Sequence, residues 1–377
     1  MSGITLMLLG NVAVVPVVQG YLNTVGWNDF HSGAIGDNSS VNRSSPVQVG
    51  SLNTWSKIGA GTFVSTSIKV DGTMWYWGRG NNGQLGDGQK IKRSSPVQIG
   101  SLTTWFRSSS GAYASIATKT DGTLWTFGTS NYGQLGRNNT LNTSSPVQVG
   151  SLTDWLQPVG SVRSMYCVKT DGTLWSFGGN ADAGELGINS RISQSSPVQI
   201  GSLTTWSQVS SQGDSNTAAA VRSDGYLFTW GSNAQGQLGI NVSGGSQYRS
   251  SPVQVGSNDW ASVSMGASHC MAIKTNGTLW GWGNGGNGEL GSGANANTSS
   301  PIQIGALTDW KEVSAGKAYT IAVRTNGTMW AMGWGDSGRL GQNNVTSYNS
   351  PVQIGSLTTW LNVVAGSGHS VMLKAIT

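Results

Sequence analysis

The chain has 377 residues, a formal net charge of +5 and only 10% charged residues. A nucleic-acid-binding protein would be expected to gather Lys and Arg on one surface, so this small excess of positive charge argues against that class. The chain also holds 56 glycines, which cluster with Asn and Ser in the manner of turns in an all-β protein.

Residues 1–19 are apolar and have no counterpart later in the chain. Asn11 and Pro16 interrupt an apolar run that is too short for a membrane span, and no Lys or Arg precedes it as in a secretory signal. We expect this segment to be either an extra strand on the protein's own fold or an anchor that docks into another chain. The anchor would use the apolar residues Ile4, Leu6, Met7, Leu8, Leu9, Ala13 and Val15.

The remaining residues, 20–377, contain seven copies of the motif S-P-[V/I]-Q-[V/I]-G. The spacings between successive copies are 50, 50, 51, 55, 49 and 50 residues, a period that is typical of propeller blades. One closed propeller of this length can bury a large core, so we predict a single domain over residues 20–377. The repeated prolines are Pro46, Pro96, Pro146, Pro197, Pro252, Pro301 and Pro351.

Each complete unit carries the signature of a tight β-hairpin. A Trp follows the proline motif, then two short segments rich in β-branched residues, and then an Asp-Gly or Asn-Gly pair such as Asp71-Gly72. These pairs tolerate positive φ and close two-residue hairpin turns. In most units the turn leads into T-[L/M]-W-x-[W/F/M]-G, an alternating strand that buries an aromatic side chain between units, and then into a loop that ends in G-x-L-G.

The two ends of the chain complement each other. The last unit stops after Lys374, where other copies continue into a turn and another strand, and residues 20–26 with 33–36 match that missing half. Pairing the N-terminal strand with the C-terminal strands would complete the seventh unit and remove two exposed sheet edges. We therefore predict a ring that is closed by its own termini.

Residues 122–136, G-T-L-W-T-F-G-T-S-N-Y-G-Q-L-G, resemble the repeats of the regulator-of-chromosome-condensation family. The resemblance extends over about residues 20 to 377 and all seven units. It implies an all-β, seven-bladed β-propeller with four-stranded blades. It does not imply one activity, because the fold hosts exchange factors, a propeller-type β-lactamase inhibitor, lectin-like modules and plain scaffolds.

One basic residue occupies the same place in every unit, just before the turn, and the fold would set these residues in a ring on one face. Our first interpretation is that each pairs with its turn Asp or faces solvent, and the alternative is a basic ring that receives an anionic partner. The residues are Lys69, Lys119, Lys169, Arg222, Lys274, Arg324 and Lys374.

Candidate catalytic groups are scarce. Nothing in the sequence forces two of its three glutamates together, as a paired-carboxylate hydrolase would need, and no three metal ligands converge. His269 and His369 hold equivalent positions in units that are not neighbours, which predicts packing histidines. Cys167 and Cys270 also lie in non-adjacent units, which predicts two buried free thiols. We expect no enzyme activity, no metal and no cofactor.

Unit four departs from the repeat in two places, and unit six in one. Trp206 and Asp224 are 18 residues apart where the other complete units have 16, and the stretch after Gly239 is about three residues longer. Loops on a rigid scaffold often carry binding groups, although drift without function is the other interpretation. The candidate partner-binding residues are Asp214, Asn216, Gln247, Tyr248, Arg249 and, in unit six, Trp334.

Three functions are compatible with these features, and all involve other protein chains and no nucleic acid. The first is a structural virion component of a bacteriophage, such as a capsid decoration, tail or fibre protein, held by residues 1–19 and facing a host-surface protein or glycan. Near-identical repeats, a charge-poor surface and the apolar leader favour it. The second is a secreted or surface bacterial propeller that binds a protein or a glycan. The third is a protein like the guanine-nucleotide exchange factors.

Overall fold

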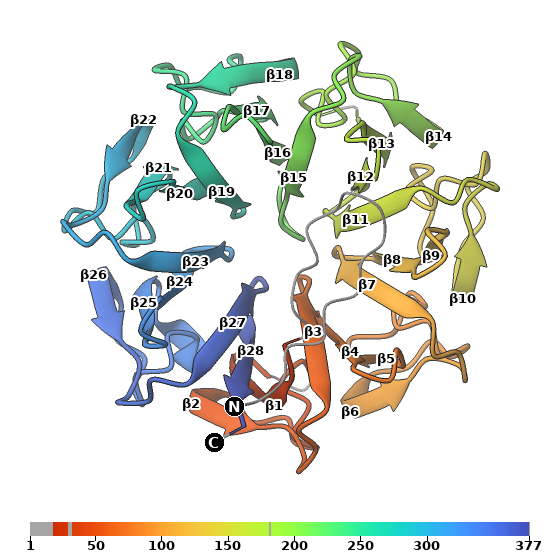
Figure 1. The fold of residues 1–377 in the computed structure, drawn as a ribbon, viewed down its shortest axis with the longest axis horizontal. Helices are drawn as coiled ribbons and strands as arrows, with labels where there is room; N and C mark the ends of the chain where they lie inside the picture. The colour runs from red at the N-terminus through yellow and green to blue at the C-terminus, as the bar shows by residue number, and fades with distance from the viewer. Residues whose placement is uncertain (1–17, 29–31, 181, 377) are drawn as a thin grey trace.

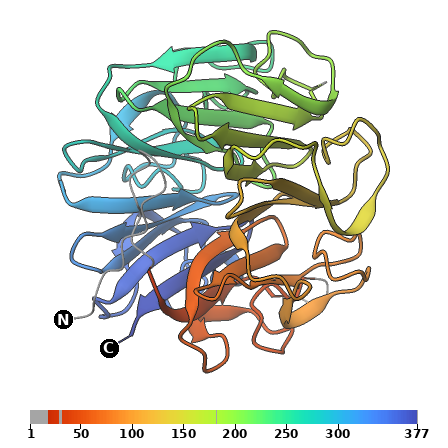
Figure 2. The same ribbon diagram turned by 45° about the vertical axis from the view of Figure 1, so that its right-hand side comes forward.

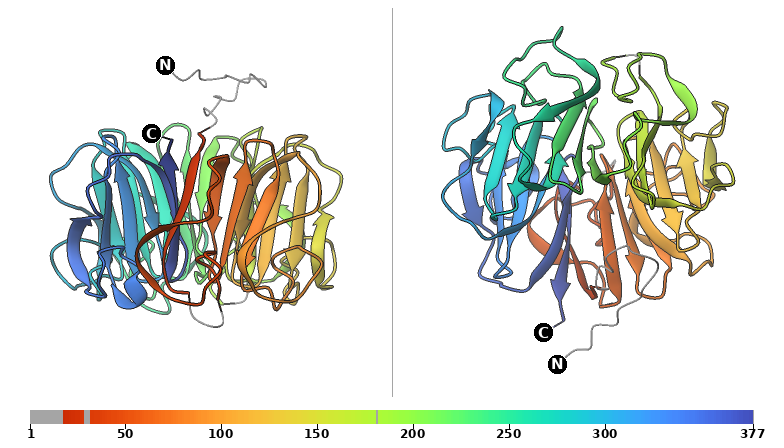
Figure 3. Two further views of the ribbon diagram at one scale, coloured as in Figure 1. Left: turned by 90° about the horizontal axis from the view of Figure 1, so that it is seen from below. Right: turned by 45° about the horizontal axis from the view of Figure 1, so that its top comes forward.

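A computed structural model of the chain describes residues 18–28, 32–180 and 182–376. Within these residues, 28 strands form seven four-stranded blades arranged in a ring (Figure 1). The strands run roughly along the axis of the ring, as the side view in Figure 3 makes clear, and Figure 2 shows the blades stacked around that axis. The predicted all-β, seven-bladed propeller is therefore confirmed.

Each blade has an inner, a second, a third and an outer strand, and blades are numbered here by their inner strands. The inner strands are β3 (Trp55–Ala60), β7 (Trp105–Ser110), β11 (Trp155–Gly160), β15 (Trp206–Ser210), β19 (Trp260–Met265), β23 (Trp310–Ala315) and β27 (Trp360–Ala365). The second strands are β4 (Val64–Lys69), β8 (Ala114–Lys119), β12 (Ser164–Lys169), β16 (Thr217–Arg222), β20 (His269–Lys274), β24 (Tyr319–Arg324) and β28 (His369–Ala375). The third strands are β5 (Met74–Gly78), β9 (Leu124–Gly128), β13 (Leu174–Gly178), β17 (Leu227–Gly231), β21 (Leu279–Gly283), β25 (Met329–Gly333) and β1 (Gly20–Gly26). The outer strands are β6 (Arg93–Gln98), β10 (Thr143–Gln148), β14 (Gln194–Gln199), β18 (Arg249–Val255), β22 (Thr298–Gln303), β26 (Tyr348–Gln353) and β2 (Arg43–Gln48).

The ring has two chemically different faces, because successive strands are antiparallel and their connections alternate between its two sides. In blade one, Trp55 at the start of β3 lies opposite Lys69 at the end of β4. The side that carries these Trp–basic pairs and the Asp-Gly and Asn-Gly turns is called the turn face. The opposite side, where the inner strand connects to the second strand, is called the hairpin face, and it includes a 3-10 helix η1 (Asp336–Gly338).

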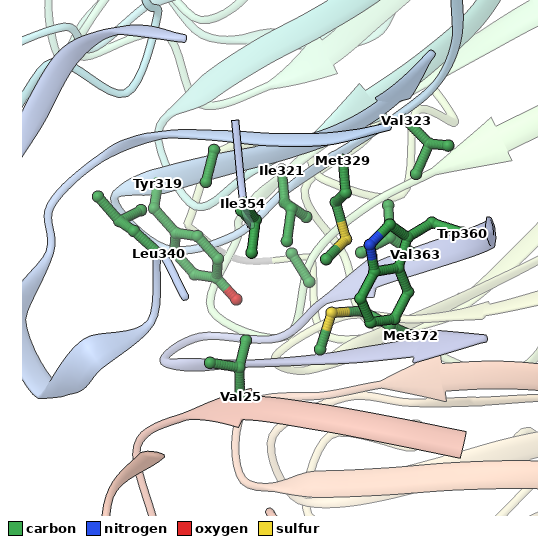
Figure 4. Close-up of a cluster of buried hydrophobic side chains, with 12 residues drawn as sticks. Val25, Tyr319, Ile321, Val323, Met329, Leu340, Ile354, Trp360, Val363 and Met372 are labelled. Atoms are coloured by element: carbon green, nitrogen blue, oxygen red, sulfur yellow. The ribbon is translucent and has the colours of Figure 1, made fainter. Parts of the chain in front are cut away.

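The termini close the ring as predicted. Strand β1 pairs with β28 over seven positions, from Gly20 opposite Ala375 to Gly26 opposite His369, and β2 pairs with the other edge of β1. Blade seven therefore takes its inner two strands from the C-terminus and its outer two from the N-terminus. Figure 4 shows the consequence for the core, because Val25 of β1 packs beside Tyr319 of blade six and Met372 of blade seven.

The T-L-W motif is explained by a repeated chain of hydrogen bonds at the turn. In blade one, Asp71 Oδ1 accepts bonds from the backbone N–H and hydroxyl of Thr73, at 2.9 and 2.7 Å. Thr73 Oγ1 in turn accepts a bond from Trp75 Nε1 at 2.9 Å. The Asp or Asn thus fixes the turn, and the Thr satisfies the indole N–H of a Trp that packs edge-on against Trp55. The same chain recurs in blades two, three, five and six.

The G-x-L-G loops join neighbouring blades. Trp282 of blade five is fully buried, and its Nε1 donates to the carbonyl of Gln237 in blade four at 3.0 Å. A Cβ on Gly239, which has a φ of +68°, would lie 2.7 Å from that indole nitrogen. Glycine is therefore required both for the backbone conformation and for the approach of the next blade's aromatic ring. Cys167 and Cys270 are free and buried, as predicted.

Candidate functional site

The basic residues of the turn face lie against aromatic rings. Lys69 Nζ is 3.8 Å from the ring centroid of Trp75 and 4.9 Å from that of Trp55, and Lys119 Nζ lies 3.7 Å from Trp125. Lys169 and Lys274 are held in the same way by the two Trp of their blades. Such cation–π contacts stabilise a charge that is partly removed from water. Burial nevertheless lowers the pKa of Lys69 and of Lys119, while Asp71 and Asp121 respectively oppose that shift.

The carboxylate partners of this ring differ from the predicted ones. Among the described residues of this ring, only Arg222 forms an ion pair with its turn Asp, Asp224, because blade four has Tyr226 and Phe228 in place of the Thr and Trp that otherwise use the turn carboxylate. In blades three, five and six the partner is the Asp immediately before the inner-strand Trp. These pairs are Lys169–Asp154 at 3.2 Å, Lys274–Asp259 at 3.0 Å and Arg324–Asp309 at 2.7 Å. Of these three blades only blade three has a turn Asp, Asp171, so the interpretation that the basic residue pairs with its turn Asp is wrong there; blades five and six have Asn276 and Asn326 at the turn.

The first insertion of blade four lies across the axis of the ring on the hairpin face. Asp214 Oδ1 accepts a hydrogen bond from Thr62 of blade one at 3.0 Å, and its Oδ2 accepts one from Ser367 of blade seven at 2.9 Å. Lys317 Nζ of blade six is 3.4 Å from the same Oδ2. Ser161 of blade three donates to the carbonyl of Ser215 at 2.6 Å. Residues 212–215, called the plug, thus tie four other blades together at their centre.

We expect Asp214→Ala to lower the free energy of unfolding by about 1–3 kcal/mol, because it removes two hydrogen bonds to a carboxylate and leaves Thr62 and Ser367 without their acceptor. Asp182→Ala is the matched control, since the side chain of Asp182 is 46% exposed and its ion pair with Arg163 is a surface one. That change should cost about 1 kcal/mol or less. Urea unfolding at pH 7 distinguishes them, and equal losses would contradict a bracing role of the plug.

The other candidate partner-binding residues also lie on the hairpin side of the ring. Asn216 donates to Asp182 at 3.2 Å, beside the Arg163–Asp182 pair. The second insertion folds on itself, with Gln247 N–H bonded to the carbonyl of Gly244 and Arg249 bonded to the carbonyls of Gln247 and Tyr248. Arg191 of blade three lies 5.1 Å from the ring of Tyr248. That these groups bind a partner stays a prediction.

Partly exposed aromatic side chains follow one arc of the hairpin face, over blades six, seven, one and two. Arginines stack on three of them: Arg339 on Trp334 at 4.4 Å, Arg79 on Phe63 at 5.3 Å and Arg163 on Tyr132 at 4.9 Å. Trp27 and Phe63 also contact each other, with ring centroids 5.3 Å apart. The aromatic arc comprises Trp27, Phe63, Tyr113, Tyr132 and Trp334. Our sequence argument found only Trp334. Phe63 and Tyr113 hold one repeated loop position, Trp27 and Trp334 hold a second, and Tyr132 a third, so comparing the units could have found them.

The two equivalent histidines link neighbouring blades and are fully buried. His369 Nε2 lies 2.9 Å from Ser65 Oγ, and His269 Nε2 lies 2.9 Å from Thr320 Oγ1. Burial lowers the pKa of His269 to about 3 and that of His369 to about 4, so both rings are neutral near pH 7. Within the described residues no group of three or more His, Cys, Asp or Glu side chains is arranged to hold a metal ion.

Three inner strands contain a charged residue that the sequence argument missed, at the second position after the Trp: Lys57, Arg107 and Glu312. Burial, with the nearby positive charge of Arg107, lowers the pKa of Lys57 to about 7. Lys57 Nζ donates to the carbonyl of Phe106 at 2.7 Å and so joins blade one to blade two. Burial also raises the pKa of Glu312 to about 7. Gln157 and Gln208 hold this position in blades three and four and bond to the backbone of the next inner strand.

The predicted leader falls almost wholly outside the described residues. All seven proposed anchor residues, Ile4, Leu6, Met7, Leu8, Leu9, Ala13 and Val15, are among those not described. Val18 is described, and it packs against the cluster of Leu22 and Trp55 where β1 begins on the turn face. No helix in the described part of the chain is both long and apolar enough to span a bilayer.

Comparison with known proteins identifies the repeat. The model described as "Regulator of chromosome condensation (RCC1) repeat" matches residues 71–118, 121–164, 224–273, 276–323 and 326–373. The human probable E3 ubiquitin-protein ligase HERC3 is 36% identical over 88 residues, which are 22% of this chain and 8% of that protein. The Arabidopsis thaliana ultraviolet-B receptor UVR8 is 38% identical over 92 residues, 24% of this chain and 20% of that protein. The matches thus span a fifth or less of these relatives' own lengths.

Solved structures give the same architecture over nearly the whole chain. Human WBSCR16 superposes with a TM-score of 0.82 at 21% identity, covering 94% of this chain and 99% of its own. Prp20p from Saccharomyces cerevisiae superposes with a TM-score of 0.83 at 19% identity, covering 96% of this chain and 92% of its own. At this level of identity the likeness establishes the propeller fold alone.

These comparisons correct the predicted function and location. The relatives are cellular proteins of human, Arabidopsis and yeast, and none is described as a virion component. The prediction of a bacteriophage capsid, tail or fibre protein is therefore wrong, as is the predicted virion location. A host-surface protein or glycan as the partner has no support either. The misleading features were the regular repeats, which belong to the propeller fold itself, and the low charge, which indicates no particular partner.

Proposed function

Because this chain belongs to the family of regulator of chromosome condensation (RCC1) repeats, we propose that it works by binding another protein against the hairpin face of its propeller. The observation that carries this proposal is the aromatic arc with its stacked arginines. Tyr113 is 40% exposed, Tyr132 42% and Trp334 39%, and aromatic and Arg side chains are those on which binding energy concentrates in protein interfaces. The plug braces this face, so that the arc is presented with little loss of entropy on binding.

The partner class that we favour is a small GTP-binding protein, whose nucleotide release the propeller would accelerate as an exchange factor does. Yeast Prp20p supports this choice, because its fold matches 96% of this chain and its structure is described together with its binding to Gsp1p and histones. Such a protein acts by binding and needs no reactive group of its own. The E3 ligase names of the human relatives HERC3, HERC6 and HERC2 refer to proteins of which this chain matches 9% or less, so we propose no ligase activity here.

The test is the release of a fluorescent GDP analogue from a panel of purified small GTP-binding proteins. The propeller should accelerate release from at least one of them, and Tyr113→Ala with Trp334→Ala should weaken that effect by about tenfold or more, as loss of interface anchors does. Leu102→Ala with Leu152→Ala is the control, since these leucines are 46% and 48% exposed on the turn face. Failure to accelerate release from any member would reject the exchange activity, and equal effects of the two double variants would reject the hairpin face.

A further inference from the structure

Six of the seven basic residues of the turn face fall into two groups. Four have a carboxylate partner within the chain: Lys169, Arg222, Lys274 and Arg324. Lys69 and Lys119, in the adjacent blades one and two, have no ion pair among the described residues, although they are only 9% and 8% exposed. Their turn carboxylates, Asp71 and Asp121, are held by hydrogen bonds to Thr73 and Thr123. Lys69 and Lys119 are called the open cation sites.

The sequence shows what the open cation sites lack. In blades three, five and six the residue before the inner-strand Trp is Asp, and its carboxylate contacts the basic residue, whereas in blades one and two it is Thr54 and Thr104. The backbone at this position is the same in both groups. The carbonyl of Thr54 accepts from Val70 N at 2.9 Å and that of Thr104 from Thr120 N at 2.8 Å, as the carbonyl of Asp154 accepts from Thr170 N at 2.9 Å. Only the carboxylate differs.

We propose that the open cation sites receive carboxylates from an acidic segment of a partner protein, which take the place that Asp154, Asp259 and Asp309 fill in other blades. Two indole rings shield the ammonium group of such a lysine from water, and they leave one direction open in which it can donate a hydrogen bond. A carboxylate that enters there forms a charge-assisted hydrogen bond where water screens the two charges less. The chain itself uses a carboxylate at this place in three blades, which is why the occupant is an Asp or Glu side chain.

The surroundings of the open cation sites fit a peptide that also carries apolar residues. An open pocket of ≈ 570 Å³ lies between β2 of blade seven and blade one, and Trp55, Lys69 and Trp75 line it together with Leu52 and Pro96. Leu52 and Leu102 occupy the same place in blades one and two and are 48% and 46% exposed. Acidic residues alternating with leucine would therefore find both kinds of contact on this part of the turn face. The site is independent of the hairpin face and of any exchange activity.

The open cation sites can be blocked by introducing the Asp that other blades of this chain already have at the same position. Thr54→Asp with Thr104→Asp should give blades one and two the internal pair that blade three already has, and should so occupy the open cation sites while the fold is kept. The probe is a fluorescein-labelled peptide of four Asp-Glu-Leu repeats, and its binding is followed by fluorescence anisotropy at low and at physiological salt. We expect the unaltered protein to bind it, and the double variant to bind it more weakly by about tenfold or more.

Two further variants make the test specific. Thr205→Asp should leave binding unchanged, because Arg222 of blade four already pairs with Asp224. Asp154→Thr should tighten binding, because it opens a third site in the blade next to blade two. The proposal is overturned if the unaltered protein does not bind the acidic peptide, if it binds a peptide of Asn-Gln-Leu repeats equally well, or if the double variant binds as the unaltered protein does. Displacement of the peptide by inorganic phosphate at equal concentration would overturn the assignment to carboxylates. Thermal unfolding of each variant verifies that the ring is intact.

Discussion

Replacing Leu22 with Ala is expected to lower the free energy of unfolding by about 2–5 kcal/mol, the range for a leucine removed from a well-packed core. Leu22 lies in β1, the N-terminal strand that completes blade seven, and none of its surface is exposed. It packs with Trp55 and Trp77 of blade one and with Leu373 of blade seven, so its loss leaves a cavity at the junction that closes the ring. The measurement is urea unfolding at pH 7.

Leu52→Ala is the matched control, because it removes the same atoms from a side chain that is 48% exposed. It should change the stability by about 0.5 kcal/mol or less. Val25→Ala gives an independent check, since Val25 lies in the same strand but packs into the cluster between blades six and seven (Figure 4). If Leu22→Ala and Leu52→Ala had equal effects, the closure of the ring by β1 would not contribute to stability in solution.

Most of the fold could be predicted because each blade repeats its own local chemistry. The Asp-Gly and Asn-Gly pairs specify the turn, and the Thr and Trp that follow carry the hydrogen bonds that the turn makes. The closure could also be predicted, because residues 20–26 match the half-unit that is missing after Lys374. The turn and the closure could be predicted because both are visible in the sequence of one unit or in the comparison of two units.

The role of the plug could not be predicted, because it depends on contacts between distant units. Nothing near Asp214 in the sequence indicates that Thr62 and Ser367, each more than 150 residues away, would donate to its carboxylate. An insertion of two residues is equally compatible with a free loop. The partners of the basic residues are a different case. Asp154, Asp259 and Asp309 stand at one repeated position, and comparing units at that position could have revealed the pairing.

The function was predicted wrongly because the amino-acid composition of a propeller's surface does not indicate which partner it binds. Low charge and regular repeats are compatible with the propeller fold whatever the protein binds. The residues that differ between blades are therefore the ones that indicate the partner. The aromatic arc and the open cation sites both consist of such differences. They occupy opposite faces, so each can be tested without disturbing the other.

Lowering the pH from 6.5 to 5 is expected to cost about 2 kcal/mol of stability for each of the two buried histidines. The pKa of His269 is about 3 and that of His369 about 4 in the folded chain, against 6.5 for an ordinary histidine. Above pH 6.5 the two histidines are neutral in the folded and in the unfolded chain, so the full stability is present. As the pH falls, only the unfolded chain takes up protons, and this lowers the free energy of unfolding. Each pH unit in this window is worth about 1.4 kcal/mol per histidine.

The hydrogen bonds of His269 explain why its ring resists protonation. Thr320 Oγ1 donates its own proton to the carbonyl of Glu289 at 2.8 Å, so it must accept from His269 Nε2–H. The neutral ring therefore carries its proton on Nε2, and Nδ1 is buried with no hydrogen-bond partner. A second proton on Nδ1 would place a charge where nothing accepts it. Around His369, burial is again the main cause, and Arg339 disfavours the charge further.

His269→Gln isolates this effect, because the Gln amide can still donate to Thr320 but does not titrate. Urea unfolding at pH 7 and pH 5 should show a smaller loss for His269→Gln than for the unaltered protein, by about 2 kcal/mol. Glu312, whose pKa is raised to about 7 by burial, acts in the opposite sense, since it weakens the fold as the pH rises from 4.5 to 7. Its contribution is present in both proteins and cancels in the difference. An equal loss in the two proteins would mean that His269 is protonated in the folded ring and that the orphaned Nδ1 is reached by water.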